Sequence, residues 1–393
     1  MNIYFRQKQR GLTLVELMIS LALGLALTAG AITIFQQNKE TYNFQESISR
    51  IQESARFAME IMARDIRSSG FRGCRSRMAQ GNSSGIHSVF RYPIETSFNE
   101  SSEVINFQRG LSGYEAVGVS GNADDWEDWE TPAGDLDASI DARNPNGGSD
   151  IIVLRSVKGT NRSATMAACA DDDGAGDITL SADLGSELQQ FDIAVVSNCE
   201  SASVFVVTND PTGDTTVSHD ATTSSGAETS RYMANLGNND ATFSICYGED
   251  GVADGSSLNR IVNIVYFIAD GFSGRPALFR MENGGAATEL IEGIEEMQIL
   301  YGEDTDVNGA VDTYATANNV GNWSNVLAVR LNLLVQSLDD NVVPTPQTLY
   351  FDRDGDDQVD TTDNASNGDR FVAPDNRVRR VFTTTIALRN RVS

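Results

Sequence analysis

The stretch LTLVELMISLALGLALTAGAITIF, residues 12–35, decides the fold, because its only charged side chain is that of Glu16. An α-helix rises about 1.5 Å per residue, so this stretch reaches about 36 Å and can cross a hydrocarbon core of about 30 Å. The apolar part of a secretory signal peptide is shorter and ends at a small-residue cleavage site. Residues 12–35 therefore predict a membrane-spanning helix.

The helix is expected to continue through residues 36–69 in an amphipathic form. Apolar residues recur there at steps of three and four, which is the period of one helix face. This stripe consists of Phe44, Ile48, Ile51, Ala55, Ala58, Met62 and Ile66. Charged residues between them, up to Asp65, are expected to face solvent. Arg67 in the last turn and Gly70 just past it form a C-terminal stop, so we predict one helix over residues 12–69 whose second half packs on a globular domain.

After Gly70 the sequence changes to short β-type runs bounded by Gly, Asn, Asp and Ser, which are typical turn residues. The expected strands are residues 150–157, 191–198, 203–209, 259–270, 276–281, 295–302, 326–336 and 379–389. The predicted fold class is α+β, with a long N-terminal helix packed on a large, mostly antiparallel β domain.

The predicted organisation has five parts. They are a leader at 1–11, an apolar helix half at 12–35, an amphipathic half at 36–69, a first β-rich lobe with long loops at 70–250, and a second lobe with acidic loops and a C-terminal strand at 251–393.

Charge and motifs exclude several functions. The formal net charge is −26, and such an acidic surface repels phosphate backbones, so no direct nucleic-acid binding is expected. No P-loop or dinucleotide fingerprint is present. The G-x-S-x-G match at residues 81–85 lacks the preceding strand and following helix of a nucleophile elbow. We expect a protein that is not an enzyme.

The chain contains four cysteines and two histidines, with no C-x-x-C pair, so a zinc site is not expected. An even number of cysteines behind an export-type N-terminus favours two disulfides and leaves their pairing open. The cysteines are Cys74, Cys169, Cys199 and Cys246.

Two acidic segments resemble calcium loops, which use oxygen ligands at alternate positions and a Gly for the sharp turn. In the first, Gly309 permits the turn, and Ala315 stands where an EF-hand has its bidentate acid. A complete EF-hand is therefore excluded, and a weaker site requires an acid from elsewhere; the alternative is an acidic turn. The candidate ligands are Asp304, Asp306, Asn308, the carbonyl of Ala310, and Asp312.

The second segment, residues 352–363, has better ligand spacing but places Asp357 where the turn requires Gly. Its alternative interpretation is a solvated insertion. The candidate ligands are Asp352, Asp354, Asp356, Asp360 and Asp363.

The run RGLTLVELMISLALG, residues 10–24, resembles the class III signal of type IV prepilins: a basic leader, a Gly, and an apolar helix with Glu at its fifth position. This resemblance implies that a prepilin peptidase cuts between Gly11 and Leu12 and methylates the new amine of Leu12. A carboxylate in hydrocarbon costs several kcal/mol unless it is paired. We therefore expect Glu16 to meet a neighbour's amine in a filament core and set the axial register.

Further segments resemble the PilW family of large minor pilins. They are residues 63–74 (ARDIRSSGFRGC), 274–314, 323–337 (WSNVLAVRLNLLVQS) and 379–391 (RRVFTTTIALRNR). The resemblance implies a minor pilin in a priming or tip complex, anchored in the inner membrane before assembly and present in the pilus afterwards. Its implied partners are other minor pilins, the major pilin and a PilY-type tip adhesin, and its implied disulfides are Cys74–Cys199 and Cys169–Cys246.

Two other functions stay open. A minor pseudopilin of a type II secretion system also has a bulky domain and can bind calcium, but it typically lacks the fifth-position Glu, so Glu16 argues against it. A membrane-anchored, calcium-dependent adhesin that never polymerises is the third possibility.

Overall fold

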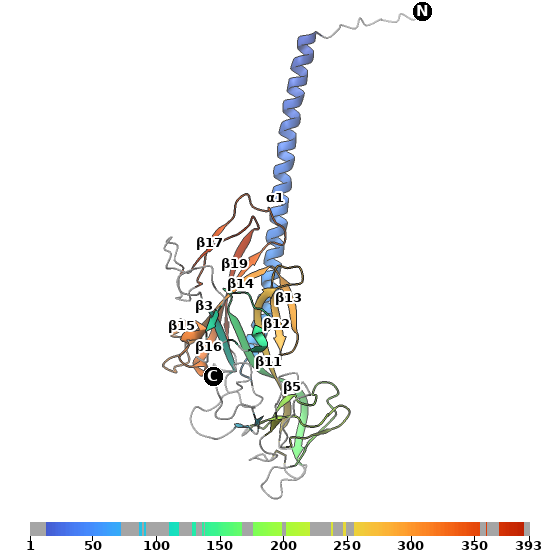
Figure 1. Cartoon of the computed structure of the whole chain (residues 1–393), viewed down its shortest axis with the longest axis vertical. Coiled ribbons are helices and arrows are strands. Elements are labelled where there is room, and N and C mark those ends of the chain that lie inside the picture. Colours follow the sequence, from blue (N-terminus) through green and yellow to red (C-terminus); the bar gives the residue numbers. More distant parts are fainter. Residues whose placement is uncertain are drawn as a thin grey trace, which may run out of the picture.

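The computed structural model describes residues 13–71, 86–88, 90–91, 110–117, 128–130, 136, 138–166, 176–198, 202–220, 237–238, 247–248, 255–353, 359 and 369–388. In this part of the chain, a single long helix stands on an elongated β-rich domain, and its N-terminal half projects far beyond the domain (Figure 1).

Helix α1 spans Leu14–Ser68, a length of 55 residues. Thr13 caps its N-terminus. At its C-terminus the Ser69 N–H donates a hydrogen bond to the Ile66 carbonyl at 3.1 Å. Gly70 follows with φ 78°, a left-handed conformation that glycine adopts without a Cβ clash. The single continuous helix predicted from the sequence is therefore confirmed over the described residues.

The largest sheet has 11 strands, and its main order is β1-β8-β7-β11-β5-β3-β4. Off this path, β12 pairs with β11 and β13 with β12, while β6 pairs with β5 and β9 with β6. Only β1 and β8 pair in parallel among these strands. The strands are β1 Ile86–Ser88, β3 Leu111–Val117, β4 Asp128–Glu130, β5 Ile151–Met166, β6 Ile178–Leu180, β7 Ile193–Ser197, β8 Ala202–Val206, β9 Thr216–Val217, β11 Ser257–Asp270, β12 Pro276–Glu282 and β13 Ala287–Glu292.

A second, four-stranded antiparallel sheet has the order β15-β14-β16-β19. Its strands are β14 Ile294–Glu303, β15 Thr313–Ala315, β16 Val326–Gln336 and β19 Arg379–Ala387. Two small pairs complete the described strands, namely β2 Phe90–Arg91 with β10 Gly237–Asn238, and β17 Thr348–Tyr350 with β18 Arg370–Val372. The short helices are α2 Ala138–Asp141, η2 Ala317–Asn319 and η3 Trp323–Asn325.

Strand β11 separates two hydrophobic cores, because successive side chains of a strand point to opposite faces. Tyr266 and Ile268 belong to the core that also contains the apolar stripe of α1 and the inner faces of β14 and β16. Val265 and Phe267 belong to the core on the other face, with residues of β7 and β8. Because both faces are covered, nearly every residue of β11 is buried.

All eight strands predicted from the sequence are present, and the α+β class is confirmed. Strand β5 runs to Met166, well beyond the predicted end at residue 157. Most of the extension, residues 158–166, is polar and only Ala164 and Met166 enter a hydrophobic core, yet its backbone pairs with the start of β11 and with β6. Hydrogen bonding to neighbours, which sequence periodicity does not encode, explains the added length.

The expectation that Asp65 faces solvent is wrong. Asp65 is only 8% exposed, and its carboxylate accepts hydrogen bonds from the Tyr266 hydroxyl at 2.7 Å and from Arg280 Nε at 3.2 Å. Both partners lie on distant strands, so the local helix pattern revealed neither the burial of Asp65 nor the groups that satisfy its charge. A buried carboxylate is tolerated there because it is both paired and hydrogen-bonded.

Candidate functional site

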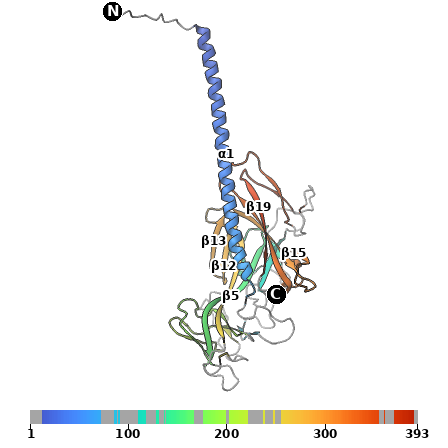
Figure 2. The ribbon, with the colours of Figure 1, turned by 180° about the vertical axis from the view of Figure 1, so that it is seen from behind.

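The N-terminal half of α1 is apolar and uncovered. By length and composition α1 is able to cross a membrane, and its apolar window has no part buried against the domain. Figures 1 and 2 show this half standing clear of all the strands. The large exposed hydrophobic residues here are Leu14, Val15, Leu17, Met18, Ile19, Leu21, Leu23, Leu25, Leu27, Ile32, Ile34 and Phe35. An apolar surface of this extent indicates that lipid or other apolar helices cover it.

Glu16 is held in a capping box with Thr13. Its carboxylate accepts hydrogen bonds from the Thr13 backbone N–H and hydroxyl, each at 3.0 Å, while the Glu16 N–H donates to the Thr13 hydroxyl oxygen at 3.3 Å. The arrangement satisfies otherwise unpaired N–H groups of the first helical turn. Glu16 therefore has local partners before any second molecule is present. The Thr-x-x-Glu spacing is the sequence signal that would have predicted this role.

Gly11 and Leu12, the predicted cleavage and methylation residues, lie outside the described residues. The predicted ion pair between Glu16 and a neighbour's amine also stays a prediction, because it requires a second subunit.

The second half of α1 packs on the domain through the predicted stripe. Ile51, Ala55, Ala58, Met62 and Ile66 are all buried, at 2% exposure or less. Phe44, at the upper end of the stripe, is 41% exposed because it lies above the covered part of the helix. The stripe joins one core with strands β13, β14, β16 and β19, so the helix and the domain form one packed unit.

Polar contacts fix the lower end of α1 to the sheet. The pKa of Tyr266 is raised by burial and by the neighbouring Asp65 carboxylate, so its hydroxyl stays protonated and donates to Asp65. Arg280 Nε neutralises the same carboxylate at 3.2 Å. Just past the helix, the Ser69 hydroxyl donates to the Gly110 carbonyl, and the Gly70 N–H donates to the Arg155 carbonyl at 2.8 Å. These contacts anchor the helix end to β3 and β5 and to β11 and β12.

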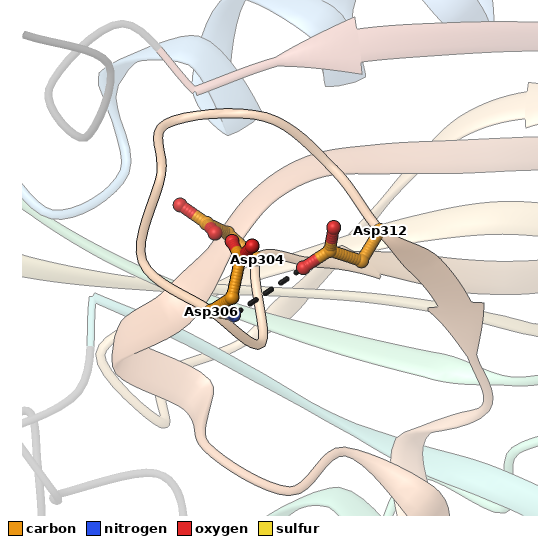
Figure 3. A group of neighbouring side chains, drawn as sticks. All are labelled: Asp304, Asp306 and Asp312. Atoms are coloured by element: carbon orange, nitrogen blue, oxygen red, sulfur yellow. Dashed lines mark hydrogen bonds between the residues drawn. The ribbon is translucent and has the colours of Figure 1, made fainter.

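The first acidic segment forms a loop between β14 and β15 (Figure 3). One carboxylate oxygen from each of Asp304, Asp306 and Asp312 can be chosen so that all three lie within 4.8 Å of one another. Asp304 is buried and the other two residues are exposed. The structure thus brings together the three carboxylates that the sequence pattern predicted to converge.

Backbone N–H groups of this loop donate hydrogen bonds to the carboxylate oxygens of Asp304 and Asp312. Asp304 accepts from the N–H groups of Asn308 at 3.0 Å and Gly309 at 2.8 Å. Asp312 accepts from the Thr305 N–H at 2.8 Å and the Asp306 N–H at 3.3 Å. Hydrogen bonds from the Thr305 side chain and backbone hold the pKa of Asp312 below its ordinary value, so this carboxylate stays charged.

Asn308 and Ala310 are linked within the same loop. The Asn308 side-chain oxygen accepts the Ala310 N–H at 2.8 Å, and the Asn308 amide donates to Asp306 at 2.9 Å. Gly309 has φ 90°, as the predicted sharp turn requires.

The second acidic segment is described only at its start. Asp352 is buried just after β17, whereas Asp354, Asp356, Asp360 and Asp363 lie outside the described residues. The four cysteines, Cys74, Cys169, Cys199 and Cys246, do so as well, and both disulfide pairings stay predictions.

Several buried carboxyl groups were not predicted from the sequence, and Asp150 and Glu115 are two of them. Asp150 accepts the Ala116 N–H at 2.9 Å and the Ile299 N–H at 2.7 Å, which connects β3 to β14. Burial raises the pKa of Asp150 to about 7 despite these hydrogen bonds. Burial, together with the Asp150 carboxylate, also raises the pKa of Glu115 well above its ordinary value. The sequence around Asp150 and Glu115 does not show that these two acids are buried, because acids on the surface occur in similar surroundings.

Comparison with known proteins adds two matches. Residues 265–390 match the family model described as Type IV Pilus-assembly protein W, and residues 6–32 match the Prokaryotic N-terminal methylation motif. No curated protein and no solved structure matches. The methylation motif lies at the start of α1, and the other match covers the strands from the second half of β11 to β19.

A methylation motif that opens a long exposed apolar helix, followed by a β domain packed on that helix, defines the class of type IV pilins. Within this class the chain is similar to the PilW family of minor pilins over residues 265–390, which include the strands of the second sheet that contact α1. The resemblance drawn from the sequence is therefore confirmed.

Proposed function

We propose that this chain is a minor pilin that joins a complex of minor pilins and so initiates type IV pilus assembly, in support of twitching motility, adhesion or DNA uptake. The observation that supports this proposal most directly is the uncovered apolar half of α1, rigidly continuous with a half that packs on the domain. Lipid can cover this surface in the membrane, and apolar helices of other subunits can cover it in a fibre.

Before assembly, the apolar half spans the inner membrane, with Arg6, Lys8 and Arg10 on the cytoplasmic side and the domain in the periplasm. This orientation follows the excess of positive residues in cytoplasmic flanks. A prepilin peptidase then removes residues 1–11 and methylates Leu12.

During assembly, Glu16 exchanges its partners. In the isolated chain Thr13 satisfies its carboxylate. In a bundle of apolar helices, the methylated amine of a neighbouring subunit replaces part of this hydrogen bonding, and the charge pair sets the axial register. The proposed role is structural and needs no catalytic step.

The size of the domain supports a place at the fibre tip. The β domain is much broader than α1 (Figures 1 and 2), and a wide domain is accommodated more easily at an end than along a closely packed shaft. The proposed neighbours are other minor pilins, the major pilin and a PilY-type tip adhesin. Immunogold labelling confined to fibre ends supports this position, and label spread evenly along sheared pili contradicts it.

We also propose that the loop at residues 304–312 binds calcium. Its three converging carboxylates supply the hard oxygen ligands that calcium prefers. Calcium titration of the purified chain, followed by isothermal calorimetry, tests the proposal. Binding that is lost in Asp304→Asn and Asp312→Asn variants supports it, and heat of binding unchanged in both variants contradicts it.

Deletion of the gene tests the function and separates the alternatives. Loss of pili and of twitching supports the proposed function. Loss of exoprotein secretion with normal pili supports a pseudopilin, and normal pili with lost attachment supports a membrane-anchored adhesin.

A further inference from the structure

Strand β19 lies at the edge of the second sheet and pairs with β16 on one side only, among the strands that the structure describes. It spans nine residues. The other one-sided strands of the two larger sheets are shorter, and the longest of them, β13, has six residues. Short edge strands limit pairing with other chains. Strand β19 lacks this protection.

The hydrogen bonds at both ends of β19 show which of its backbone groups face β16. The Leu388 N–H donates to the Leu327 carbonyl, and the Ser337 N–H donates to the Val378 carbonyl, each at 2.8 Å. The register between these two pairs is continuous, without a bulge. Because bonded and non-bonded pairs alternate along antiparallel strands, the even-numbered residues of β19 bond to β16. The N–H and carbonyl groups of the odd-numbered residues therefore point away from β16.

The odd-numbered residues form a regular row along this edge. We define the free edge of β19 as Val381, Thr383, Thr385 and Ala387. Val381 is half-buried, and the other three are exposed. The edge begins after Arg379, whose N–H donates to the Gln347 side chain at 2.6 Å. It contains no proline and no bulge, which are features that block strand addition. Its N–H and carbonyl groups are thus arranged to pair with one more strand.

The side chains beside the free edge define the segment that fits it. Ile386 is buried in the core shared with α1, and Phe382 packs on that core while staying half-exposed. Thr383 and Thr385 are exposed on the opposite face. A strand that continues the pleat would carry apolar residues on the α1 side and polar residues on the outer side. Arg380 is exposed and forms no ion pair within the described residues, so it favours an acidic residue opposite.

Charge and orientation disfavour a second copy as the source of this segment. Two chains with a net charge of −26 repel each other. Strand β19 runs away from the projecting half of α1, toward the level of β15 (Figure 1). A two-fold antiparallel pair of β19 edges would therefore point the two α1 helices in opposite directions. Two copies in one membrane have the same orientation.

We propose that an extended segment of a different fibre subunit adds to the free edge of β19 as a further strand of the second sheet. Backbone hydrogen bonds supply the affinity, and the alternation of apolar and polar side chains supplies the specificity. This inference rests on the proposed function, because it assumes that the chain assembles with other subunits. The contact joins domains and is separate from the packing of the apolar halves of the helices.

A photoreactive benzoyl-phenylalanine at position 387, in the full chain expressed in fibre-producing cells, tests the free edge. Thr179 is the matched control position, since it is exposed on β6, which has a strand on both sides. We expect an adduct from position 387 that joins this chain to a different protein. Peptide mass spectrometry should place the crosslink on a segment that alternates apolar and polar residues. Position 179 should not yield this adduct.

A proline tests the backbone pairing. Thr385→Pro removes an N–H that points away from β16, so the hydrogen bonds within the sheet remain. The yield of the position-387 adduct should fall by about fivefold, which is the effect of one lost backbone hydrogen bond. Thr385→Val keeps the N–H and should leave the yield unchanged.

Hydrogen exchange in the detergent-solubilised chain tests the free edge without any substitution. The amides of Thr383 and Thr385 should exchange about tenfold faster than those of Phe382 and Thr384, which bond to β16. Equal protection of all four amides would overturn the inference, because another part of the same chain would then already occupy the edge.

Three further results overturn the inference: an adduct with twice the mass of this chain, no adduct at position 387 in cells with normal fibres, or a yield that Thr385→Pro does not lower. Failure of the proposed function has a different signature. In that case deletion of the gene leaves fibres normal, whatever position 387 contacts.

Discussion

The hydroxyl of Tyr266 in β11 donates a 2.7 Å hydrogen bond to the carboxylate of Asp65, in the last turns of α1. Arg280 of β12 binds the same carboxylate at 3.2 Å. One buried acid thus joins the helix to two strands of the large sheet. Because the fibre would pull on the domain through α1, this contact is a mechanical link between the assembly helix and the domain.

Replacing Asp65 with Ala should destabilise the chain by about 2 kcal/mol, because the buried Tyr266 hydroxyl loses its acceptor and the half-buried Arg280 loses one of its two carboxylate partners. Thermal unfolding of the detergent-solubilised chain, followed by circular dichroism, measures the effect. Arg56→Ala is the control, since Arg56 is exposed on the same helix and its replacement should change stability little. Equal melting temperatures for the wild type and Asp65→Ala would refute the link.

The stability of the domain should fall as pH rises from 5 to 8. Asp150 has a folded pKa of about 7 against an ordinary value of 3.8, so the folded state binds this proton more tightly than the unfolded state. Its stabilising contribution is present below the ordinary pKa and is lost as pH rises through about 7. We expect a loss of about 3 kcal/mol over this range from Asp150.

The Asp150→Asn variant isolates this effect, because its side chain does not titrate. Denaturation midpoints measured at pH 5 and pH 8 should differ less in this variant than in the wild type. A wild-type chain as stable at pH 8 as at pH 5, with the variant showing the same profile, contradicts the assignment.

Val307 adopts φ 59° in the acidic loop and is 57% exposed. A β-branched residue in the left-handed region is strained by about 1 kcal/mol, whereas Asn tolerates it. Val307→Asn should therefore raise the melting temperature. Differential scanning calorimetry without calcium provides the measurement, and a lower melting temperature would show that Val307 makes a contact that outweighs its strain.

Loss of the Thr13 cap should loosen the first turn of α1. Thr13→Ala removes the hydroxyl that contacts Glu16, at a cost of about 1 kcal/mol. Hydrogen exchange of the Glu16 and Leu17 amides in the detergent-solubilised chain should accelerate by about fivefold. Thr13→Ser keeps a hydroxyl and should exchange at the wild-type rate, and unchanged exchange in Thr13→Ala would show that the cap does not hold this turn.

Sequence patterns predicted the helix and the strands that build the cores, because both depend on local periodicity. The step of three and four placed Ile51 to Ile66 on the buried face, and alternation or apolar runs marked β11, β14 and β16. The polar second half of β5 was missed, because its pairing depends on neighbouring backbone rather than on its own side chains.

The candidate sites were predicted less evenly. The converging carboxylates of Asp304, Asp306 and Asp312 followed from spacing within one loop. The burial of Asp65 and Asp150 could not be predicted, because their hydrogen-bond partners come from distant segments. The local sequence does not distinguish a buried acid from an exposed one. The Thr13–Glu16 cap is a local feature, because it depends only on the Thr-x-x-Glu spacing at the start of α1.

The intact mass of this chain in a sheared fibre fraction tests the central claim most directly. The account predicts a chain that begins at Leu12, carries one added methyl group and is recovered with the fibres. A chain found only in membranes, with residues 1–11 still attached, would contradict it.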